Sequence, residues 1–130
     1  MSPELVNDEN GKLSKGTVKD VQKLDGLKPE FKAKVDQVFD ELTDKGYNLR
    51  VIWGRRTLNE NNALVAKGMA SRRSLHLKGL AVDFVERSIG YNNADHPEYN
   101  AAVQQAAEHA GVRWGGSFKS RWDPNHIQAR

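Results

Sequence analysis

The stretch from Ser74 to Asp83, Ser-Leu-His-Leu-Lys-Gly-Leu-Ala-Val-Asp, most constrains how this chain can fold. His76 and Asp83 are seven residues apart, which is roughly 23 Å of extended chain at about 3.3 Å per residue. The two side chains can share one ion only if the chain turns between them, and Gly79 is placed to allow that turn. We therefore expect His76 in the loop that enters the turn and Asp83 on the strand that leaves it.

A second segment near the end of the sequence, Asp123-Pro-Asn-His126, completes a set of metal-binding groups. His126 and the first segment together supply two imidazoles and a carboxylate. Asp123 adds a spare carboxylate three residues before the last imidazole. A metal hydrolase needs three protein ligands, an open position for water and a nearby general base. The two segments therefore predict such a centre, if the fold brings them together.

Simpler explanations exist for each of these residues. Asp83 lies between Val82 and Phe84 in an otherwise apolar strand, where an unpaired carboxylate is costly. A salt bridge to an arginine would stabilise it, and His126 alone could be a hydrogen-bonded core histidine. We favour a metal because His76, Gly79 and Asp83 occur together at a workable spacing.

The other two histidines are better explained by structure. His96 lies in a loop sequence before a proline and is expected to cap a helix. His109 falls near the end of a predicted helix, where a cation interacts favourably with the helix dipole. Neither is predicted to bind the metal.

Composition limits the chemistry of the predicted site. The chain has 130 residues and no cysteine, so it is long enough for one domain with its own core, and a metal must be held by nitrogen and oxygen. Such a site suits zinc best, although cobalt, nickel or manganese could also occupy it. The absence of cysteine also excludes disulfides, iron–sulfur clusters and a cysteine nucleophile.

The charge of the chain is weakly informative about its partners. A net charge of +3 and a pI of about 9.2 favour encounters with polyanions such as nucleic acid, anionic lipid or bacterial wall polymers. No basic stripe with interleaved aromatic residues is present, so we predict no nucleic-acid partner; that alternative depends on the pI alone. A monomer is the default expectation.

The sequence at the N-terminus gives an expectation about localisation. Residues 1–10 are polar and acidic and lack the features of a signal peptide, and no apolar run is long enough to span a bilayer. We expect synthesis in the cytoplasm without stable membrane insertion. Residues 1–16 are predicted to form a flexible arm, and residues 17–130 a single catalytic domain.

Apolar periodicity and end signals predict about three helices, which run from Pro29 to Gly46, from the Thr57 capping box to Lys67 and from Pro97 to Gly111. Branched and aromatic residues predict short strands at residues 48–53, 80–85, 112–114 and 126–128. Several connections are too short for parallel crossovers. The expected fold class is therefore α+β with a small, mainly antiparallel sheet.

These motifs resemble those of the M15 zinc peptidases. The pattern Ser-x-His-x-x-Gly-x-Ala-x-Asp is filled from Ser74 to Asp83, and (Asp/Glu)-x-x-His is filled by residues 123–126. The segment from Gly54 to Gly68 is similar to the family's Gly-x-Arg-Thr-x-x-Glu-Gln-x-x-Leu stretch, with Asn61 where glutamine is usual, and we assign Asn61 no role. Trp114-Gly-Gly is similar to the Trp-Gly-Gly segment that leads into the second motif in the endolysin branch of the family. The resemblance spans roughly residues 17–128.

The resemblance implies the small α+β fold of the D-alanyl-D-alanine peptidases, shared with the Hedgehog signalling domain. It implies that zinc is bound by His76, Asp83 and His126. It also implies that Asp123 is the general base and acid, acting on water and then on the leaving amine.

Two further residues receive roles from the same resemblance. Arg56 would polarise the scissile carbonyl and stabilise the oxyanion. Arg55 is adjacent, but the two side chains should point apart, so only one can face the site. Ser74 would bind substrate or orient its loop, and a simple serine turn is equally compatible with the sequence.

The function implied is hydrolysis of bacterial peptidoglycan at the L-alanyl-D-glutamate bond, by a phage-type endolysin that a holin releases to the wall. A D-alanyl-D-alanine dipeptidase or carboxypeptidase is one alternative. A second is a zinc-stabilised binding module without activity, although Asp123 and Arg56 argue against it.

Overall fold

The computed structural model describes residues 23–130. The predicted arm at residues 1–16 lies outside them. Within the described part of the chain, no helix has the length and apolar character needed to cross a membrane.

A four-stranded antiparallel sheet with the order β1-β2-β4-β3 forms the centre of the fold. Its strands are β1 (Leu49–Trp53), β2 (Ala81–Glu86), β3 (Arg113–Trp114) and β4 (His126–Gln128). Strand β4 pairs with both β2 and β3, so the last segment of the chain lies inside the sheet. The predicted α+β class with a small antiparallel sheet is confirmed.

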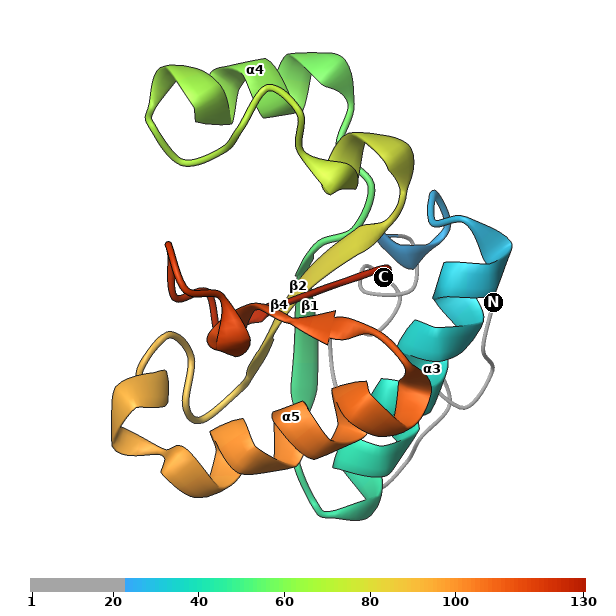
Figure 1. Cartoon of the computed structure of the whole chain (residues 1–130), viewed down its shortest axis with the longest axis vertical. Coiled ribbons are helices and arrows are strands. Elements are labelled where there is room, and N and C mark those ends of the chain that lie inside the picture. The colour runs from blue at the N-terminus through green and yellow to red at the C-terminus, as the bar shows by residue number, and fades with distance from the viewer. Residues whose placement is uncertain (1–22) are drawn as a thin grey trace.

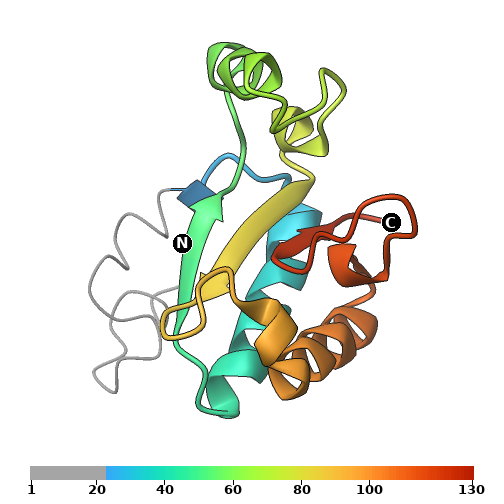
Figure 2. The same cartoon turned by 90° about the vertical axis from the view of Figure 1, so that its left-hand side faces the viewer.

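Helices α3 (Pro29–Asp44) and α5 (Pro97–Ala110) pack on each other and on the sheet (Figures 1 and 2). Proline begins each helix, where its missing N–H is not needed. Apolar side chains at helical spacing face inward, and Phe39 meets Phe84 of β2 edge to face at 5.0 Å. Alanines on α5 allow the two helices to approach closely. The buried side chains of α3, α5 and the sheet together form the apolar core.

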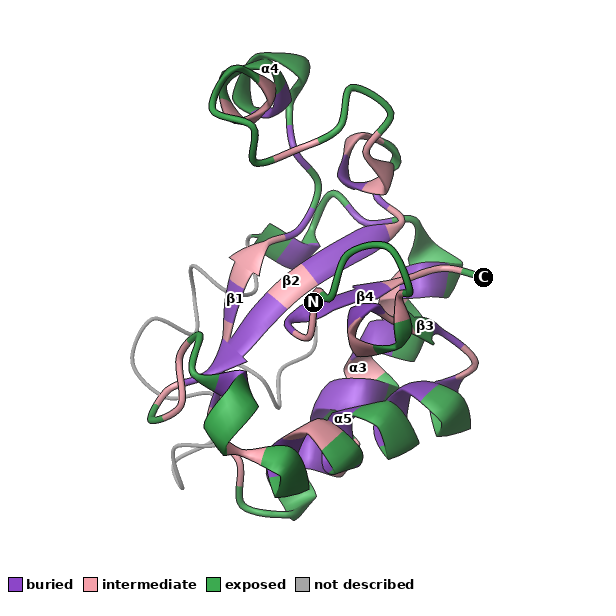
Figure 3. Cartoon of the chain, turned by 60° about the vertical axis from the view of Figure 1, so that its left-hand side comes forward, coloured by how far each residue is buried: buried purple, intermediate pink, exposed green. Residues whose placement is uncertain are grey.

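Helix α4 (Leu58–Ala66) stands apart from α3 and α5, as both Figure 1 and Figure 2 show. The predicted capping box is present: Thr57 Oγ1 accepts from Glu60 N–H at 3.1 Å, and Glu60 accepts from Thr57 N–H at 2.8 Å. Most of α4 is exposed in Figure 3. Within residues 58–66, all of which the structure describes, Asn61 is the one buried residue.

One local expectation needs correction. His96 occupies the position before α5, but its side chain makes no capping bond, because Nδ1 faces the Glu98 carboxylate at 3.4 Å instead. Gly115 and Gly116 begin the short 3-10 helix η3 (Gly115–Ser117). His109 is exposed and pairs with Glu41 at 2.8 Å, so its structural assignment is confirmed.

Alternation along β2 separates the core from the site. Val82 and Phe84 are fully buried in the apolar core, so the residue between them, Asp83, points to the opposite face. The same alternation places Ile127 in the core and its neighbour His126 on the face of Asp83. The polar residues of the two motifs therefore share the sheet face that α3 and α5 leave open.

Candidate metal centre and active site

His76, Asp83 and His126 converge on this open face of the sheet. Asp83 is the direct partner of His126 in the register of β2 and β4. Its Oδ1 lies 2.7 Å from His126 Nδ1, and its Oδ2 lies 3.2 Å from His76 Nε2. One ligand atom from each of the three residues lies within 4.8 Å of the others. The fold therefore brings together the three donor residues that the sequence predicts.

The turn at Gly79 delivers His76 to this group. His76 lies in the 3-10 helix η1 (Leu75–Lys78), which Gly79 ends in the left-handed region at φ 70°. A Cβ at Gly79 would also lie 2.6 Å from the carbonyl oxygen of Gly26. Both the backbone angle and the close approach therefore favour glycine, as the spacing of the motif predicts.

The outer nitrogen of each imidazole is already held by the protein. His76 Nδ1 lies 2.8 Å from Gly54 O, and His126 Nε2 lies 2.9 Å from Gln128 Oε1. Both oxygens accept, so both outer nitrogens donate. In the neutral rings the inner nitrogens then carry lone pairs directed at the Asp83 carboxylate. A cation shared by the three groups satisfies this arrangement, so the donor set fits a divalent metal.

Without a bound metal, a protonated His126 can donate from Nδ1 to Asp83, and the charges of the two groups then support each other. Burial alone would raise the pKa of Asp83, but hydrogen bonds to His126 and His76 outweigh burial and hold that pKa far below its usual range. Burial alone would lower the pKa of His126, but its hydrogen bond to Asp83 raises it above its usual value. Asp83 is therefore an anion at neutral pH, as a ligand must be.

Asp123 stands beside this group without joining it. Its side chain is half exposed, and Oδ2 lies 3.8 Å from His126 Nδ1. Burial raises the pKa of Asp123; the nearby His126 lowers it and the Asp83 charge raises it, with a net increase. A carboxylate with a raised pKa holds a proton more readily than an ordinary surface aspartate.

The Trp114-Gly115 pair fixes the loop that carries Asp123. Trp114 Nε1 donates to Pro124 O at 2.8 Å, and Asp123 N–H donates to Gly115 O at 3.0 Å. A Cβ at Gly115 would lie 2.1 Å from the Asp123 carbonyl oxygen, so a side chain there would displace the loop. The Trp114-Gly-Gly motif therefore positions the loop that carries Asp123.

Arg56 faces the metal group and Arg55 does not, as predicted. Arg56 is 6% exposed, and its Nη2 lies 3.3 Å from Asp83 Oδ2. Its guanidinium also stacks on Trp53 at 5.0 Å. Arg55 is exposed, and its side chain lies against Gly26. Burial lowers the pKa of Arg56, although neighbouring carboxylates oppose that shift.

Asn61 is the residue that sequence reasoning missed. It is fully buried, and its Oδ1 accepts from Arg56 Nη1 at 3.2 Å. Its Nδ2 donates to Ser71 O at 2.8 Å, which ties α4 to the loop before η1. The available signal was its place one residue after Glu60, where the related segment carries another amide. Asn61 therefore binds Nη1 of Arg56, while Asp83 faces Nη2.

Comparison with known proteins identifies the family. The profile of an M15 peptidase family, described as D-alanyl-D-alanine carboxypeptidase, matches residues 67–129. This span contains His76, Asp83, Asp123 and His126, the metal group and its neighbouring carboxylate. The chain belongs to the M15 peptidases. No curated protein matches it significantly.

Three solved structures resemble this M15 peptidase. The L-Ala D-Glu endopeptidase ChiX of Serratia marcescens is 27% identical with a TM-score of 0.67, covering 85% of this chain and 86% of ChiX. The LD-carboxypeptidase LdcB is 24% identical (TM-score 0.60), covering 79% of this chain and 58% of its own. A zinc complex of the vancomycin-resistance D,D-pentapeptidase VanY is 18% identical (TM-score 0.60), with coverages of 79% and 72%. The last two support the fold alone.

Ser74 contacts both His76 and Arg56 in this M15 peptidase. Its Oγ accepts from His76 N–H at 3.2 Å and lies 3.4 Å from Arg56 Nη1. The first contact is the serine turn considered from the sequence. The second joins the loop to Arg56, and Ser74 also lines the cavity over the metal group.

Two cavities open beside the metal group of the M15 peptidase. The first, about 420 Å³, is here called the basic cavity because Arg73 and Arg121 line it together with both imidazoles of the metal group. The second, about 280 Å³, is called the aromatic cavity because Trp53, Tyr91 and Trp122 line it. Both cavities share four lining residues, Arg56, Met69, Asp83 and Asp123. The reactive groups therefore lie where the two cavities meet.

Proposed function

We propose that this M15 peptidase is a zinc-dependent endopeptidase that hydrolyses the L-alanyl-D-glutamate bond of peptidoglycan stem peptides. The observation that carries the proposal is the pair of cavities that meet at Asp83 and Asp123. An endopeptidase must accommodate substrate on both sides of the scissile bond. A carboxypeptidase needs little room beyond the terminal residue.

Similarity to a known enzyme supports the same bond. ChiX, whose coverage is high in both chains, is an L-Ala D-Glu endopeptidase. The exposed arginines of the basic cavity also suit a substrate with free carboxylates, as stem peptides have. The positive charge of the chain favours encounter with anionic wall polymers.

Zinc is the proposed metal, held by His76, Asp83 and His126. Two neutral imidazoles and one carboxylate are a zinc donor set that leaves a position for water. When bound, zinc would lower the pKa of water and polarise the scissile carbonyl. The hydrogen bonds from the rings to Gly54 and Gln128 orient the two imidazoles for this role.

Asp123 and Arg56 would carry the rest of the reaction. As the water oxygen bonds to the carbonyl carbon, a carboxylate oxygen of Asp123 takes one proton from the water. When the carbon–nitrogen bond breaks, Asp123 gives that proton to the leaving amine. Arg56 would stabilise the negative charge that develops on the carbonyl oxygen. Ser74 would contribute to substrate binding from the same wall.

The biological role proposed is host cell lysis by a phage-type endolysin. In this proposal the protein acts as a monomer made in the bacterial cytoplasm and reaches the wall after a holin permeabilises the membrane. Residues 17–130 form the catalytic domain. No nucleic acid or stable membrane insertion is required.

Digestion of purified peptidoglycan tests the proposed bond. The fragments are labelled at their new amino termini and identified by mass spectrometry. We expect new D-glutamate amines in proportion to solubilised wall. Release of free D-alanine or its dipeptide, without D-glutamate amines, would instead establish the D-alanyl-D-alanine peptidase alternative.

An Asp123→Ala variant separates an enzyme from an inactive binding module. We expect the variant to keep its fold and its metal but to lose roughly 10²- to 10⁴-fold in rate. Circular dichroism and metal analysis of the same sample control for fold and occupancy. Equal wall lysis by Asp123→Ala and the unchanged protein would overturn the proposed mechanism.

A further inference from the structure

The two cavities beside the metal group differ sharply in chemistry. The basic cavity is lined by the exposed Arg73 and Arg121 and by two serines, together with the apolar Leu75 and Phe118. The aromatic cavity is lined by apolar side chains from several segments of the chain, Ile52, Trp53, Leu64, Met69, Tyr91 and Trp122. A substrate that crosses the metal group must therefore place unlike chemical groups at its two ends.

The aromatic cavity is exposed in a way that ordinary packing does not require. Tyr91 is 75% exposed, Met69 61% and Trp122 53%, although all three are large apolar side chains. They come from three separate loops and line one cavity. Exposed apolar groups gathered around a cavity are typical of a ligand-binding site.

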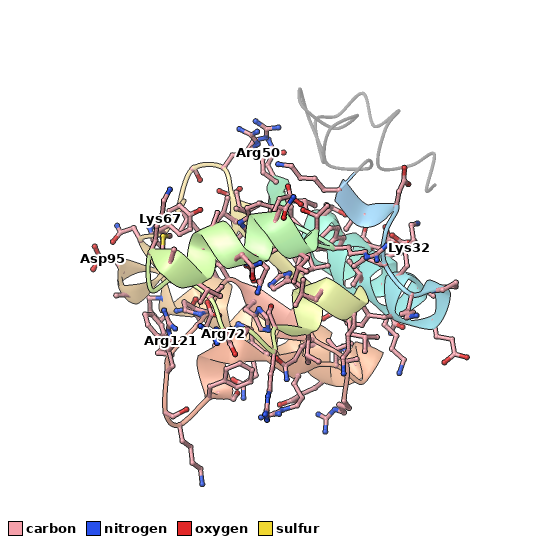
Figure 4. All side chains as sticks on the ribbon, turned by 90° about the horizontal axis from the view of Figure 1, so that it is seen from above. Lys32, Arg50, Lys67, Arg72, Asp95 and Arg121 are labelled. Atoms are coloured by element: carbon pink, nitrogen blue, oxygen red, sulfur yellow. The ribbon has the colours of Figure 1, made fainter. Side chains whose placement is uncertain are left out.

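The basic cavity offers donors for an anionic group. In Figure 4, seen from above, Arg121 lies to one side of α4 and Arg50 to the other. Arg121 lines this cavity together with Asp123. Arg73 lies two residues after Ser71, whose carbonyl oxygen accepts a hydrogen bond from Asn61 Nδ2. Guanidinium groups recognise carboxylates through paired hydrogen bonds.

The proposed substrate is itself asymmetric around the scissile bond. On the amine side, the D-glutamate residue carries a free α-carboxylate next to the bond. On the acyl side, L-alanine is joined through a lactyl group to a sugar ring. That side presents methyl groups and the C–H face of the sugar, which aromatic side chains can cover.

We infer that the stem peptide binds in one direction, with its D-glutamate carboxylate in the basic cavity and its alanyl-lactyl-sugar end in the aromatic cavity. This inference rests on the proposed function, because it assumes the same scissile bond. Trp122 and Tyr91 contact the sugar end, and Arg73 and Arg121 bind the carboxylate. The scissile carbonyl then lies where the cavities meet, beside Arg56 and Asp123.

One experiment measures the contribution of the sugar. The ratio of kcat/KM is determined for a disaccharide-linked stem peptide and for the same peptide capped with an acetyl group. We expect Trp122→Ala to lower this ratio several-fold, by loss of one aromatic contact. Leu58→Ala is the matched control, because Leu58 is 64% exposed on α4 but lines neither cavity. It should leave the ratio unchanged.

A second experiment measures the contribution of the carboxylate. Here the ratio of kcat/KM compares acetyl-capped peptides with D-glutamate and with its α-amide. We expect Arg73→Ala to lower this ratio about tenfold, the effect of one charged hydrogen bond. Arg72→Ala is the matched control, since Arg72 is exposed next to Arg73 but does not line the basic cavity.

The outcomes separate this inference from the proposed function. If the unchanged protein releases no D-glutamate amine from any peptide, the proposed function is wrong. If it cleaves the peptides but Trp122→Ala and Arg73→Ala leave both ratios unchanged, the direction of binding is wrong. If Trp122→Ala affects the carboxylate ratio and Arg73→Ala the sugar ratio, the peptide binds in reverse.

Discussion

The two sides of this molecule are held together by different forces. Below the sheet, α3 and α5 bury a continuous apolar core, and Figure 3 shows buried residues (purple) alternating with exposed ones along α5. Above it, α4 and η1 are held by hydrogen bonds, and α4 has Asn61 as its one buried residue among residues 58–66, which are all described. Stability therefore comes mainly from the first side, and the geometry of the site depends on the second.

Phe39→Ala should destabilise the apolar side more than any other substitution proposed. Phe39 is fully buried against Phe84, and the cavity left by the ring should cost about 3–5 kcal/mol of the free energy of unfolding. Urea denaturation followed by circular dichroism measures the loss. Lys34→Ala, at an exposed site on the same helix, should change that free energy by less than about 0.5 kcal/mol. A similar loss in both variants would contradict the comparison.

On the polar side, Asn61→Ala should lower both catalysis and stability, whereas Phe39→Ala should lower stability alone. Arg56 loses the acceptor that fixes one side of its guanidinium, so we expect kcat to fall on the order of 10- to 100-fold. The free energy of unfolding should fall by about 1–3 kcal/mol, because buried donors lose their partner. Asn62→Ala, at an exposed position on the same helix, is the control.

A double-mutant cycle tests whether Asn61 acts through Arg56. In an Arg56→Ala background, Asn61→Ala should add little further loss of kcat, because the residue it positions is gone. If the two losses multiply instead, Asn61 is only structural. Asn61→Asp keeps an acceptor for Arg56 but loses the donor to Ser71 O, so it should recover part of the lost rate.

Glu86 links stability to pH at the far end of β2. Burial would raise its pKa, but hydrogen bonds from Ser88 and from the Asn48 N–H lower it below its usual value. The stabilisation is therefore complete above the unfolded-state pKa of about 4.3 and is lost as pH falls through the folded-state pKa.

In the Glu86→Gln variant the free energy of unfolding should fall by about 2 kcal/mol at neutral pH. The amide has only one oxygen, so it cannot accept from both Ser88 and the Asn48 N–H. The variant's unfolding free energy should also fall less steeply between neutral and acid pH. Denaturation curves at several pH values measure both effects, with the exposed Glu30→Gln as control. An unchanged slope against pH would exclude Glu86 as the cause.

The smallest expected effect is at the start of α4. Thr57→Ala removes the acceptor of the capping box and should cost about 1 kcal/mol, whereas Thr57→Ser keeps the oxygen and should cost less. Hydrogen exchange of α4 amides should detect local fraying. If fraying appeared in α3 instead, the two sides would not be as independent as the comparison states.

Much of this fold was predictable because its signals are local. Proline at the start of α3 and α5, the Thr57 capping box and Gly79 depend on a few adjacent residues, and the structure confirms them. The sequence did not predict that β4 lies between β2 and β3, because strand order depends on pairing between distant segments. The bulge between Val51 and Trp53, which sets Trp53 opposite Asp83, was also missed.

The site divides in the same way. His76, Asp83 and His126 were predicted because their chemistry and spacing are unusual, and the structure brings them together. Asn61 was missed because the run of polar residues at 59–62 does not indicate which side chain is buried, and the only signal was the amide at this place in the related segment. Its burial depends on how α4 meets the loop at Ser71.

Metal stoichiometry tests the central claim most directly, namely that His76, Asp83 and His126 hold one metal while Asp123 remains outside it. Elemental analysis after dialysis against buffered zinc would compare the unchanged protein with Asp83→Ala and Asp123→Ala. We predict one zinc per chain in the unchanged protein and in Asp123→Ala, and almost none in Asp83→Ala. Zinc retained by Asp83→Ala, or lost from Asp123→Ala, would contradict this division of roles.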